Sequence, residues 1–260
     1  NSPDMKYGKP RYFTGKEPYC PLEWTPPLSH NAPSEGPKAR ALACRLFKQE
    51  SGEWLVLDDY QTKLIDSILE VYPANYEVEH LRGCLRFRQA IVSIPRRNGK
   101  SLIASVLVTY SMVMSAAPNI GVLASTKEQA KEVFENVRYN FDNSEVLKSR
   151  FKTTNHRGIE SKRSDRPAHF KIHAGKGDSL QGITFVGIVP VVIDELHITK
   201  QEAYDAAVKG ASTNPSAVVV GITTAGTDTS DLLKRLYKTG RAAILGGEDS
   251  NPRFGFWHWT

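Results

Sequence analysis

The sequence predicts an α/β domain built on a mostly parallel sheet with helices on both of its faces. Several strand-length runs are apolar throughout, as strands buried on both faces are. They alternate with longer segments whose apolar residues recur every three or four positions, as in helices. Strands and helices that alternate in this way form parallel sheets covered by helices. The chain has 260 residues, 40% hydrophobic and 24% charged, which is enough to bury such a sheet.

The individual elements are inferred from spacing and residue type. In residues 57–69, apolar side chains recur at intervals of three and four, which predicts a helix with one buried face: Tyr60, Leu64, Ile65, Ile68 and Leu69. The apolar runs predict strands at residues 85–94, 119–124, 185–193 and 217–223, and the alternating aromatics from Phe254 to Trp259 predict a terminal strand. Further helices are expected within residues 41–54 and at residues 101–114, 126–139, 200–209 and 230–245.

The beginning of the chain lacks such a pattern. Residues 1–40 hold eight of the fifteen prolines and show little periodicity. This composition predicts an extended or partly disordered arm, followed by one domain of residues 41–260.

Composition narrows the class of protein. No apolar run approaches the ~20 residues that a membrane-spanning helix needs, so we expect no membrane association. The three cysteines share no close spacing, which argues against a disulfide framework or a zinc site and favours reduced, mostly buried thiols. The net charge of +6 suits contact with a polyanion without requiring it.

Residues 93–101 read SIPRRNGKS and lie between an expected strand and an expected helix. Such a junction binds nucleotide phosphates, because backbone N–H groups and the helix N-terminus face the anion. Lys100 is expected to reach the β and γ phosphates, and the Ser101 hydroxyl to hold Mg²⁺. The usual motif has a glycine five residues before Gly99, where this chain has Ile94.

The same loop carries two adjacent arginines. Arg96 and Arg97 form a solvated pair unless an anion lies between them, since two guanidinium groups repel each other. With Asn98 and Gly99 they complete the expected nucleotide-binding loop.

A later apolar run, VPVVIDELH over residues 189–197, contains two adjacent carboxylates at the end of its apolar part. Charges at the carboxyl end of a buried strand lie in the crevice where α/β sheets bind ligands. We expect Asp194 to hold Mg²⁺ and Glu195 to orient and polarise the attacking water. The alternative is a helix N-terminus that carries acids because the helix dipole favours them.

A third run, VVVGITTAG over residues 218–226, ends in small hydroxyl residues. Thr223 and Thr224 can sense the γ phosphate and pass on its loss, or can simply be a strand end before a glycine turn. The order of the three segments favours the nucleotide interpretation.

Together these motifs resemble the large-terminase family of tailed bacteriophages. PRRNGKS is typical of the phosphate loop of that family, which often lacks the leading glycine, and ITTAG is similar to its coupling motif. VVIDELH is also similar to the D-E-x-H box of superfamily-two helicases. Tyr60 and Gln61 resemble an adenine-recognising glutamine motif, so the resemblance spans residues 57–226.

The resemblance implies an ATPase with a RecA-like P-loop NTPase fold, which uses ATP and Mg²⁺ to move double-stranded viral DNA into a procapsid. Gln61 would read the adenine edge beside Tyr60, and Arg96 would touch the γ phosphate. The family implies as partners duplex DNA, a portal protein, a small terminase subunit and, in relatives with this type of sequence, a separate HNH endonuclease. It also implies a homo-oligomeric ring when assembled on the portal, with either a monomer or an oligomer for the isolated chain, and a location in the cytoplasm of the infected bacterial cell.

Two features depart from the family pattern. Relatives carry an arginine upstream of the acidic strand that acts on a neighbouring subunit's ATP, but this chain has Gln181 there. The trans-acting arginine is therefore either missing or replaced by another basic residue, for which Arg157, Arg163 and Lys176 are the candidates. No second cluster of carboxylates resembles the family's nuclease half, so we expect no DNA cleavage by this chain.

Residues 148–176 are rich in positive charge and turn residues. From residue 150 to 176 there are two acids against eight basic residues, at positions 150, 152, 157, 162, 163, 166, 171 and 176. This segment can hold DNA phosphates, form a charged subunit interface, or be a mobile, solvated loop. The rival functions are a helicase-like DNA translocase or remodeller unconnected with capsids, and a DNA-binding scaffold with a degenerate nucleotide site.

Overall fold

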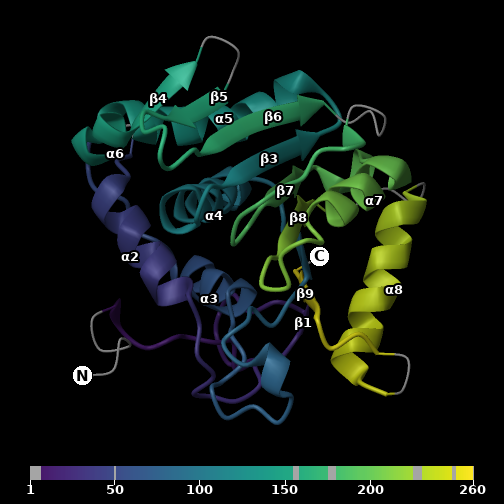
Figure 1. Ribbon diagram of the computed structural model, residues 1–260. Coiled ribbons are helices and arrows are strands. Elements are labelled where there is room, and N and C mark those ends of the chain that lie inside the picture. Colours follow the sequence, from purple (N-terminus) through teal and green to yellow (C-terminus); the bar gives the residue numbers. More distant parts are fainter. Residues whose placement is uncertain are drawn as a thin grey trace.

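The chain folds around one twisted sheet (Figure 1). The computed structural model describes residues 7–49, 51–154, 158–174, 180–224, 230–247 and 250–259. The strand order of the sheet within the described residues is β1-β9-β2-β8-β7-β3-β6-β5-β4. The strands are β1 Glu23–Trp24, β2 Gln89–Ser93, β3 Asn119–Ala124, β4 Phe151–Thr154, β5 Gly158–Ser161, β6 His169–Ala174, β7 Val191–Asp194, β8 Val219–Thr223 and β9 Phe254–His258. The helices are α2 Gly36–Leu46, α3 Asp59–Ile68, α4 Lys100–Met114, α5 Lys127–Asn143, α6 Glu145–Arg150, α7 Gln201–Gly210 and α8 Asp231–Leu245, with short 3₁₀ turns η1 Glu79–Leu81 and η3 Leu196–Ile198.

The six central strands, from β9 to β6, are all parallel. Antiparallel strands are added only at the edges, β1 beside β9 and the pair β5 and β4 beside β6. The expected mostly parallel sheet is therefore confirmed. The terminal strand expected from the alternating aromatics is also present, as β9, and it pairs with β2.

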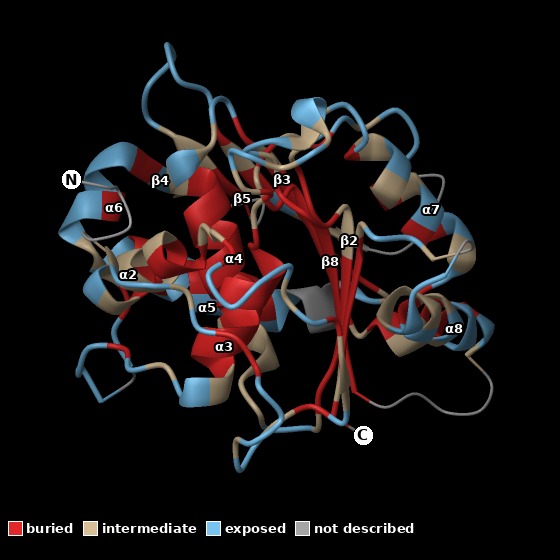
Figure 2. Cartoon of the chain, turned by 90° about the horizontal axis from the view of Figure 1, so that it is seen from below, coloured by how far each residue is buried: buried red, intermediate tan, exposed pale blue. Residues whose placement is uncertain are grey.

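Helices cover both faces of the sheet. Helices α2, α3, α4 and α5 lie on one side, and α7 and α8 on the other (Figure 2). Along β2 the side chains alternate between the two cores: Ala90 and Val92 pack with the first group of helices, and Ile91 packs with the second. A strand that serves two cores must be apolar on both of its faces, as Ala90, Ile91 and Val92 are.

Three expected elements differ from the observed ones. The strand expected at residues 185–193 is paired as β7 only from Val191, since Gly187 and Pro190 interrupt the run. The helix expected within residues 41–54 begins at Gly36, with a proline in its first turn, and it crosses the proposed domain boundary at residue 40. The charged stretch 148–176 is not wholly a loop, because it contains the end of α6 and the strands β4, β5 and β6.

The described part of the proline-rich segment lies against the domain. β1 pairs with β9, and the Phe13 ring packs edge-on against Trp259 with ring centroids 5.8 Å apart. The Tyr12 hydroxyl donates to the Ala32 carbonyl at 2.9 Å. The three cysteines are free and half-buried rather than fully buried. No helix in the described ranges is both long and apolar enough to span a membrane.

Helices α2 and α3 meet at Gly36, where a methyl group would overlap the Cα and the carboxylate of Asp66. We expect Gly36→Ala to lower the free energy of unfolding by about 1–3 kcal/mol, the usual cost of overfilling a packed site. Urea denaturation measures the effect, with Arg45→Ala on the exposed side of α2 as the control. Equal midpoints for the two variants would contradict the close approach of the helices.

Candidate functional site

The three motifs meet at the carboxyl ends of three central strands of the sheet. Strands β2, β8 and β7 are neighbours and parallel, so the segments that follow them lie side by side at their carboxyl ends. The Ile94 N–H donates to the Thr223 carbonyl at 2.9 Å, which joins the phosphate loop directly to the end of β8. Asp194 ends β7 on the other side of β8. The three motifs therefore lie together at the carboxyl ends of neighbouring strands, where α/β sheets bind ligands.

The loop from Pro95 to Gly99 turns without a glycine at its start. Ile94 is fully buried in the core and continues the line of β2, so no conformational freedom is needed there. The sharp turn comes later, at Arg97 with φ 64° and Gly99 with φ 66°, both in the left-handed region. Helix α4 then begins at Lys100, with its N-terminus at the loop.

Lys100 of the phosphate loop and Glu195 of the acidic motif form an ion pair at these strand ends. The Lys100 Nζ lies 2.7 Å from the Glu195 Oε1, and the two side chains are 12% and 24% exposed. Glu195 itself has a left-handed backbone, with φ 52° and ψ 51°, which is rare for a residue other than glycine. Backbone strain of this kind is found where a side chain must be held in one place, and here the carboxylate is directed at the phosphate loop.

Asp194 is a buried carboxylate whose negative charge is only partly offset by its neighbours. Burial above all, and then the charge of Glu195, raise the pKa of Asp194 to about 6, against the attraction of Lys100. Its Oδ1 accepts a hydrogen bond from the Glu195 N–H at 3.0 Å. A divalent cation beside this carboxylate would favour its charged form.

Ser101 lies near a carboxylate that the sequence did not single out. Its hydroxyl donates to the Glu132 Oε1 at 2.9 Å, and the charge of Glu132 contributes to the raised pKa of Asp194. Within the described ranges, no three His, Cys, Asp or Glu side chains are grouped closely enough to hold a metal by themselves. Ser101 and Asp194 fit Mg²⁺, which prefers oxygen ligands and usually takes one or two from the protein and the rest from phosphates and water.

The other side of the loop rests on α3 and on the N-terminal segment. The Tyr60 hydroxyl donates to the Asn98 carbonyl at 2.7 Å, and the Tyr19 hydroxyl donates to the Asn98 Oδ1 at 2.8 Å. The Gln61 Nε2 donates to the Tyr60 hydroxyl at 3.2 Å and lies against Gly99, where any Cβ would come within 2.5 Å of it. Gln61 therefore supports the loop through its amide nitrogen.

Gln61 also has a local role in its own helix. Its Oε1 accepts a hydrogen bond from the Asp58 N–H at 3.0 Å, which completes a capping box at the start of α3. Sequence reasoning found Tyr60 and Gln61 but missed Tyr19, whose contact spans 79 positions of the chain.

The end of β8 is tied to the segment that follows Glu195. The Thr223 hydroxyl accepts from the His197 N–H at 3.2 Å and donates to the Thr224 carbonyl at 2.8 Å. Thr223 and Thr224 are both buried. Arg96 and Arg97 are exposed in the turn, and neither forms an ion pair with another residue of the described chain.

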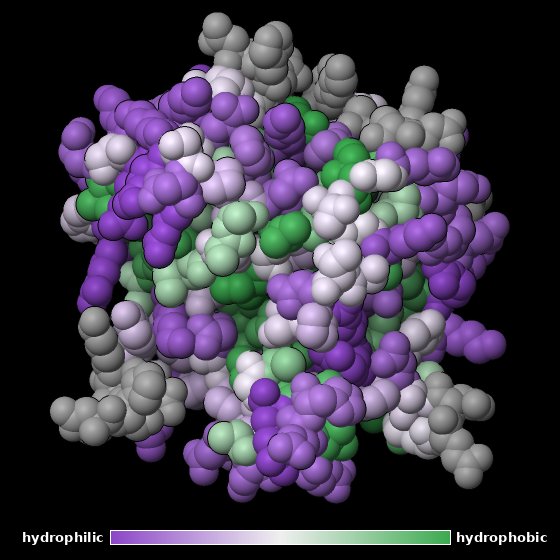
Figure 3. Space-filling view, viewed as in Figure 1, coloured by the Kyte–Doolittle hydropathy of each residue, from purple (hydrophilic) through white to green (hydrophobic). Residues whose placement is uncertain are grey.

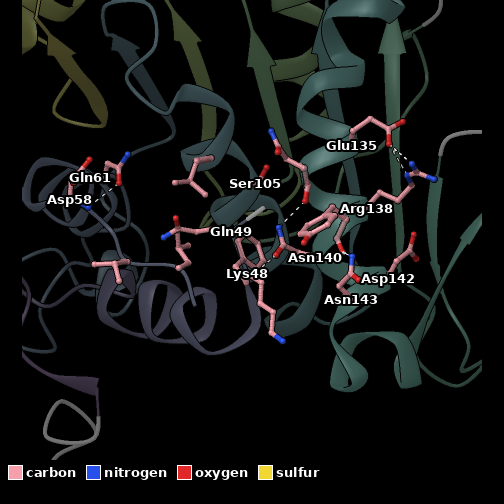
Figure 4. A pocket seen from close by; sticks show the side chains of 16 residues that line it. Lys48, Gln49, Asp58, Gln61, Ser105, Glu135, Arg138, Asn140, Asp142 and Asn143 are labelled. Carbon is pink, nitrogen blue, oxygen red and sulfur yellow. Dashed lines mark hydrogen bonds and ion pairs between the residues drawn. The ribbon is translucent and has the colours of Figure 1, made fainter. Parts of the chain in front are cut away.

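A cavity of about 720 Å³ opens next to the first turn of α4 (Figure 4). Asp58 and Gln61, at the amino end of α3, lie on one side of it, and side chains of α5 lie on the other. Leu102 and Tyr139 contribute apolar surface, and several amides, among them Asn136, contribute hydrogen-bonding groups. Its volume and mixed lining suit a small organic group.

The basic segment surrounds a second hollow, of about 560 Å³, between the carboxyl end of α4 and the amino end of β6. Arg150, Arg163 and Arg166 line it with one acid, Asp165, which is paired with Arg163 at 2.5 Å. Hydrophilic side chains cover the neighbouring region of α6 and β4, at the upper left of Figure 3. Because α4 has 15 residues, this hollow is about 22 Å from the phosphate loop.

The candidates for a trans-acting arginine are unequal in position. Arg163 follows β5 and lies near the amino end of β6. Lys100 and Asp194 lie at the carboxyl ends of the parallel strands, on the opposite side of the sheet. Arg157 and Lys176 lie outside the described residues. Gln181 is exposed after the undescribed residues 175–179.

A mostly parallel sheet with a phosphate loop after β2 and an acidic β7 two strands away is a RecA-like P-loop fold. Residues 80–241 match the family model of the terminase large subunit, ATPase domain. Since the match covers more than half of the sequence, the chain belongs to this family.

Two solved structures have the same fold. The large terminase of bacteriophage HK97 is 18% identical, with a TM-score of 0.69 over 87% of this chain and 44% of that chain. The ATPase domain of the large terminase of Thermus phage P74-26 is 16% identical, with a TM-score of 0.52 over 66% of this chain and 75% of that one. The chain thus spans less than half the length of the HK97 protein it matches. Among curated proteins, none matches the sequence.

Proposed function

We propose that the chain hydrolyses ATP with Mg²⁺ and uses the energy to move double-stranded viral DNA into a procapsid, as the ATPase part of a large terminase. The observation that carries this proposal is the 2.7 Å pair of Lys100 and Glu195, a cation of the phosphate loop facing a carboxylate of the acidic strand. Family membership favours it over a helicase-like translocase or a scaffold with a degenerate site.

Each residue gathered at these strand ends has a role in this proposal. The loop of Arg97, Asn98 and Gly99 wraps the phosphates with backbone N–H groups, and Lys100 leaves Glu195 to bind the β and γ phosphates. Glu195 then orients and polarises the attacking water, and Arg96 folds onto the γ phosphate. Thr223 and Thr224 sense the loss of that phosphate.

Mg²⁺, held by Ser101 and Asp194, would neutralise charge on the transferred phosphate. Asp194 is already aligned by the Glu195 N–H, and Ser101 has to exchange its bond to Glu132 for the cation.

We place the nucleoside in the cavity beside Leu102, which Gln61 lines. Tyr60, its neighbour in α3, holds the adjoining loop at Asn98. The first turn of α4 leads from the phosphates directly to this cavity, whose apolar surface and amides suit the faces and edges of adenine.

The placement predicts that Tyr139→Ala weakens ATP binding about five- to thirtyfold, the loss of one aromatic contact with a base. Inhibition by inorganic triphosphate should not change, because it lacks a base. Tyr139→Phe is the matched control. Equal losses for ATP and triphosphate would contradict a base at this position.

Double-stranded DNA is the proposed polymer, held through its phosphates because a packaging motor accepts any sequence. The hollow lined by Arg150, Arg163 and Arg166 is the proposed contact with DNA. For Arg163 to act as the trans-acting arginine, the ATP site of a neighbouring subunit has to lie beside this hollow. A homo-oligomeric ring, a portal protein, a small terminase subunit and a separate HNH endonuclease are the other proposed partners, in the cytoplasm of the infected cell. We also propose that the chain has no nuclease activity. The proposed division into an arm of residues 1–40 and a motor domain of residues 41–260 has α2 spanning its boundary.

We expect Arg150→Ala combined with Arg166→Ala to weaken binding equally for unrelated duplex sequences. The slope of log K against log salt should fall by about 2, one unit for each lost phosphate contact. Lys209→Ala with Lys238→Ala, exposed lysines on α7 and α8, is the charge-matched control. An unchanged slope would remove this hollow from the DNA contact.

The function as a whole is tested by ATP turnover of the purified chain with Mg²⁺, with and without duplex DNA. Turnover that requires Mg²⁺ and rises with DNA supports an ATP-driven motor that acts on DNA. Binding of DNA without any turnover would favour the scaffold, and strand separation would favour the helicase-like alternative.

A further inference from the structure

His197 lies between the acidic strand and the strand that ends in Thr223. Its Nδ1 is 3.0 Å from the Thr223 Oγ1 and 3.1 Å from the Glu195 Oε2. Its backbone N–H also donates to the Thr223 hydroxyl. One side chain, only 17% exposed, therefore touches both the carboxylate at the phosphate loop and the hydroxyl at the end of β8.

The hydrogen bonds around Thr223 indicate which imidazole nitrogen carries a proton. The single hydroxyl proton of Thr223 is directed at the Thr224 carbonyl, so its oxygen can only accept from His197. A bare Nδ1 would also place its lone pair 3.1 Å from a carboxylate oxygen, which is repulsive. Both contacts are favourable only if Nδ1 carries the proton.

The two oxygens of Glu195 are in different situations. Oε1 is held by Lys100 at 2.7 Å. Oε2 is buried and accepts no well-aligned hydrogen bond from the described residues, although the His197 Nδ1 is within reach. When bound phosphates attract Lys100 away from Glu195, the Nδ1–H of His197 is close enough to donate to the Glu195 carboxylate.

We propose that His197 is a positioning residue, whose Nδ1–H holds Glu195 in its working orientation and links it to Thr223 in β8. The proposal rests on the hydrolytic role proposed for Glu195. A change at the end of β8 then moves the imidazole, and the imidazole moves the carboxylate, so that hydrolysis and the state of β8 depend on each other.

The test uses substitutions that separate the two imidazole nitrogens. His197→Asn keeps a donor near the position of Nδ1, whereas His197→Gln places its amide near Nε2. We expect His197→Ala and His197→Gln to lower kcat for ATP about ten- to a hundredfold with little change in KM, because a misplaced group loses rate rather than binding. His197→Asn should recover most of the rate, and His80→Ala, at an exposed histidine, should change nothing.

Thr223→Val tests the link to β8. If His197 acts through Thr223, the effect on kcat of Thr223→Val should be smaller in the His197→Ala background than in the natural protein. Full additivity, or a kcat of His197→Ala equal to that of the natural protein, would overturn the proposal. So would Gln and Asn variants with equal rates.

A measurement without nucleotide separates this proposal from the hydrolytic function. Nitrogen-15 NMR of the ATP-free protein should find a proton on Nδ1 of His197, and Thr223→Val should shift that resonance. A bare Nδ1 would overturn the proposal whether or not the chain hydrolyses ATP. Absence of turnover in the natural protein, with a protonated Nδ1, would contradict the proposed function alone.

Discussion

Glu195→Gln is expected to lower ATP turnover by about 10²–10⁴-fold while ATP binding is kept or becomes tighter. The loss of rate follows from removing the group that polarises the attacking water. The effect on binding follows from the ion pair: Lys100 is held by Glu195 at 2.7 Å, and a neutral amide releases this ammonium group for the phosphates. Single-turnover hydrolysis and equilibrium binding of a fluorescent ATP analogue measure the two effects separately.

Glu202→Gln is the matched control, since Glu202 is an exposed carboxylate in the first turn of α7. It should leave both quantities unchanged. Turnover of Glu195→Gln within about twofold of the natural protein would show that the carboxylate does not act on water, and the hydrolytic role would pass to another group.

The central sheet could be predicted from the sequence because its signals are local. The parallel strands β2, β3, β7 and β8 are buried on both faces and are therefore mostly apolar, and the phosphate loop lies in one stretch of nine residues. The parallel strand β6 has a polar residue at every second position and was not expected from the sequence. The family resemblance, read from motifs in the right order, is confirmed by the match over residues 80–241.

The edge of the sheet at β4 and β5 could not be read in the same way. Phe151, Ile159 and Phe170 are buried, whereas their neighbours in the strands, Lys152, Glu160 and Lys171, are partly or fully exposed. An edge strand of four residues shows this alternation only once or twice, and the charges dominate the composition. The segment therefore resembled a charged loop.

The contacts that complete the candidate site were missed for a different reason. Glu132 reaches Ser101, and Tyr19 reaches Asn98, across 31 and 79 positions of the chain. Neither residue belongs to a motif, and only the packing of α5 against α4 and of the N-terminal segment on the domain brings them there. His197 was visible in the acidic motif, but its spacing said nothing of Thr223, because the contact depends on β7 and β8 being neighbours.

Lys100→Ala is expected to weaken ATP binding about ten- to a hundredfold, the usual worth of a hydrogen bond to a charged group, and to reduce turnover further. It should also lower the thermal stability of the ATP-free protein, because it leaves Glu195 without its cation beside the buried Asp194. Calorimetric titration with ATP and thermal unfolding measure the two effects, and Lys209→Ala, at an exposed lysine of α7, is the control.

The double variant Lys100→Ala with Glu195→Gln distinguishes the two consequences. Thermal stability should return toward that of the natural protein, because the unpaired carboxylate is gone, whereas ATP affinity should stay low, because the phosphates still lack their ammonium group. If ATP affinity returned together with stability, Lys100 would act on Glu195 and not on the phosphates. The loop around Gly99 would then bind nucleotide through its backbone N–H groups alone.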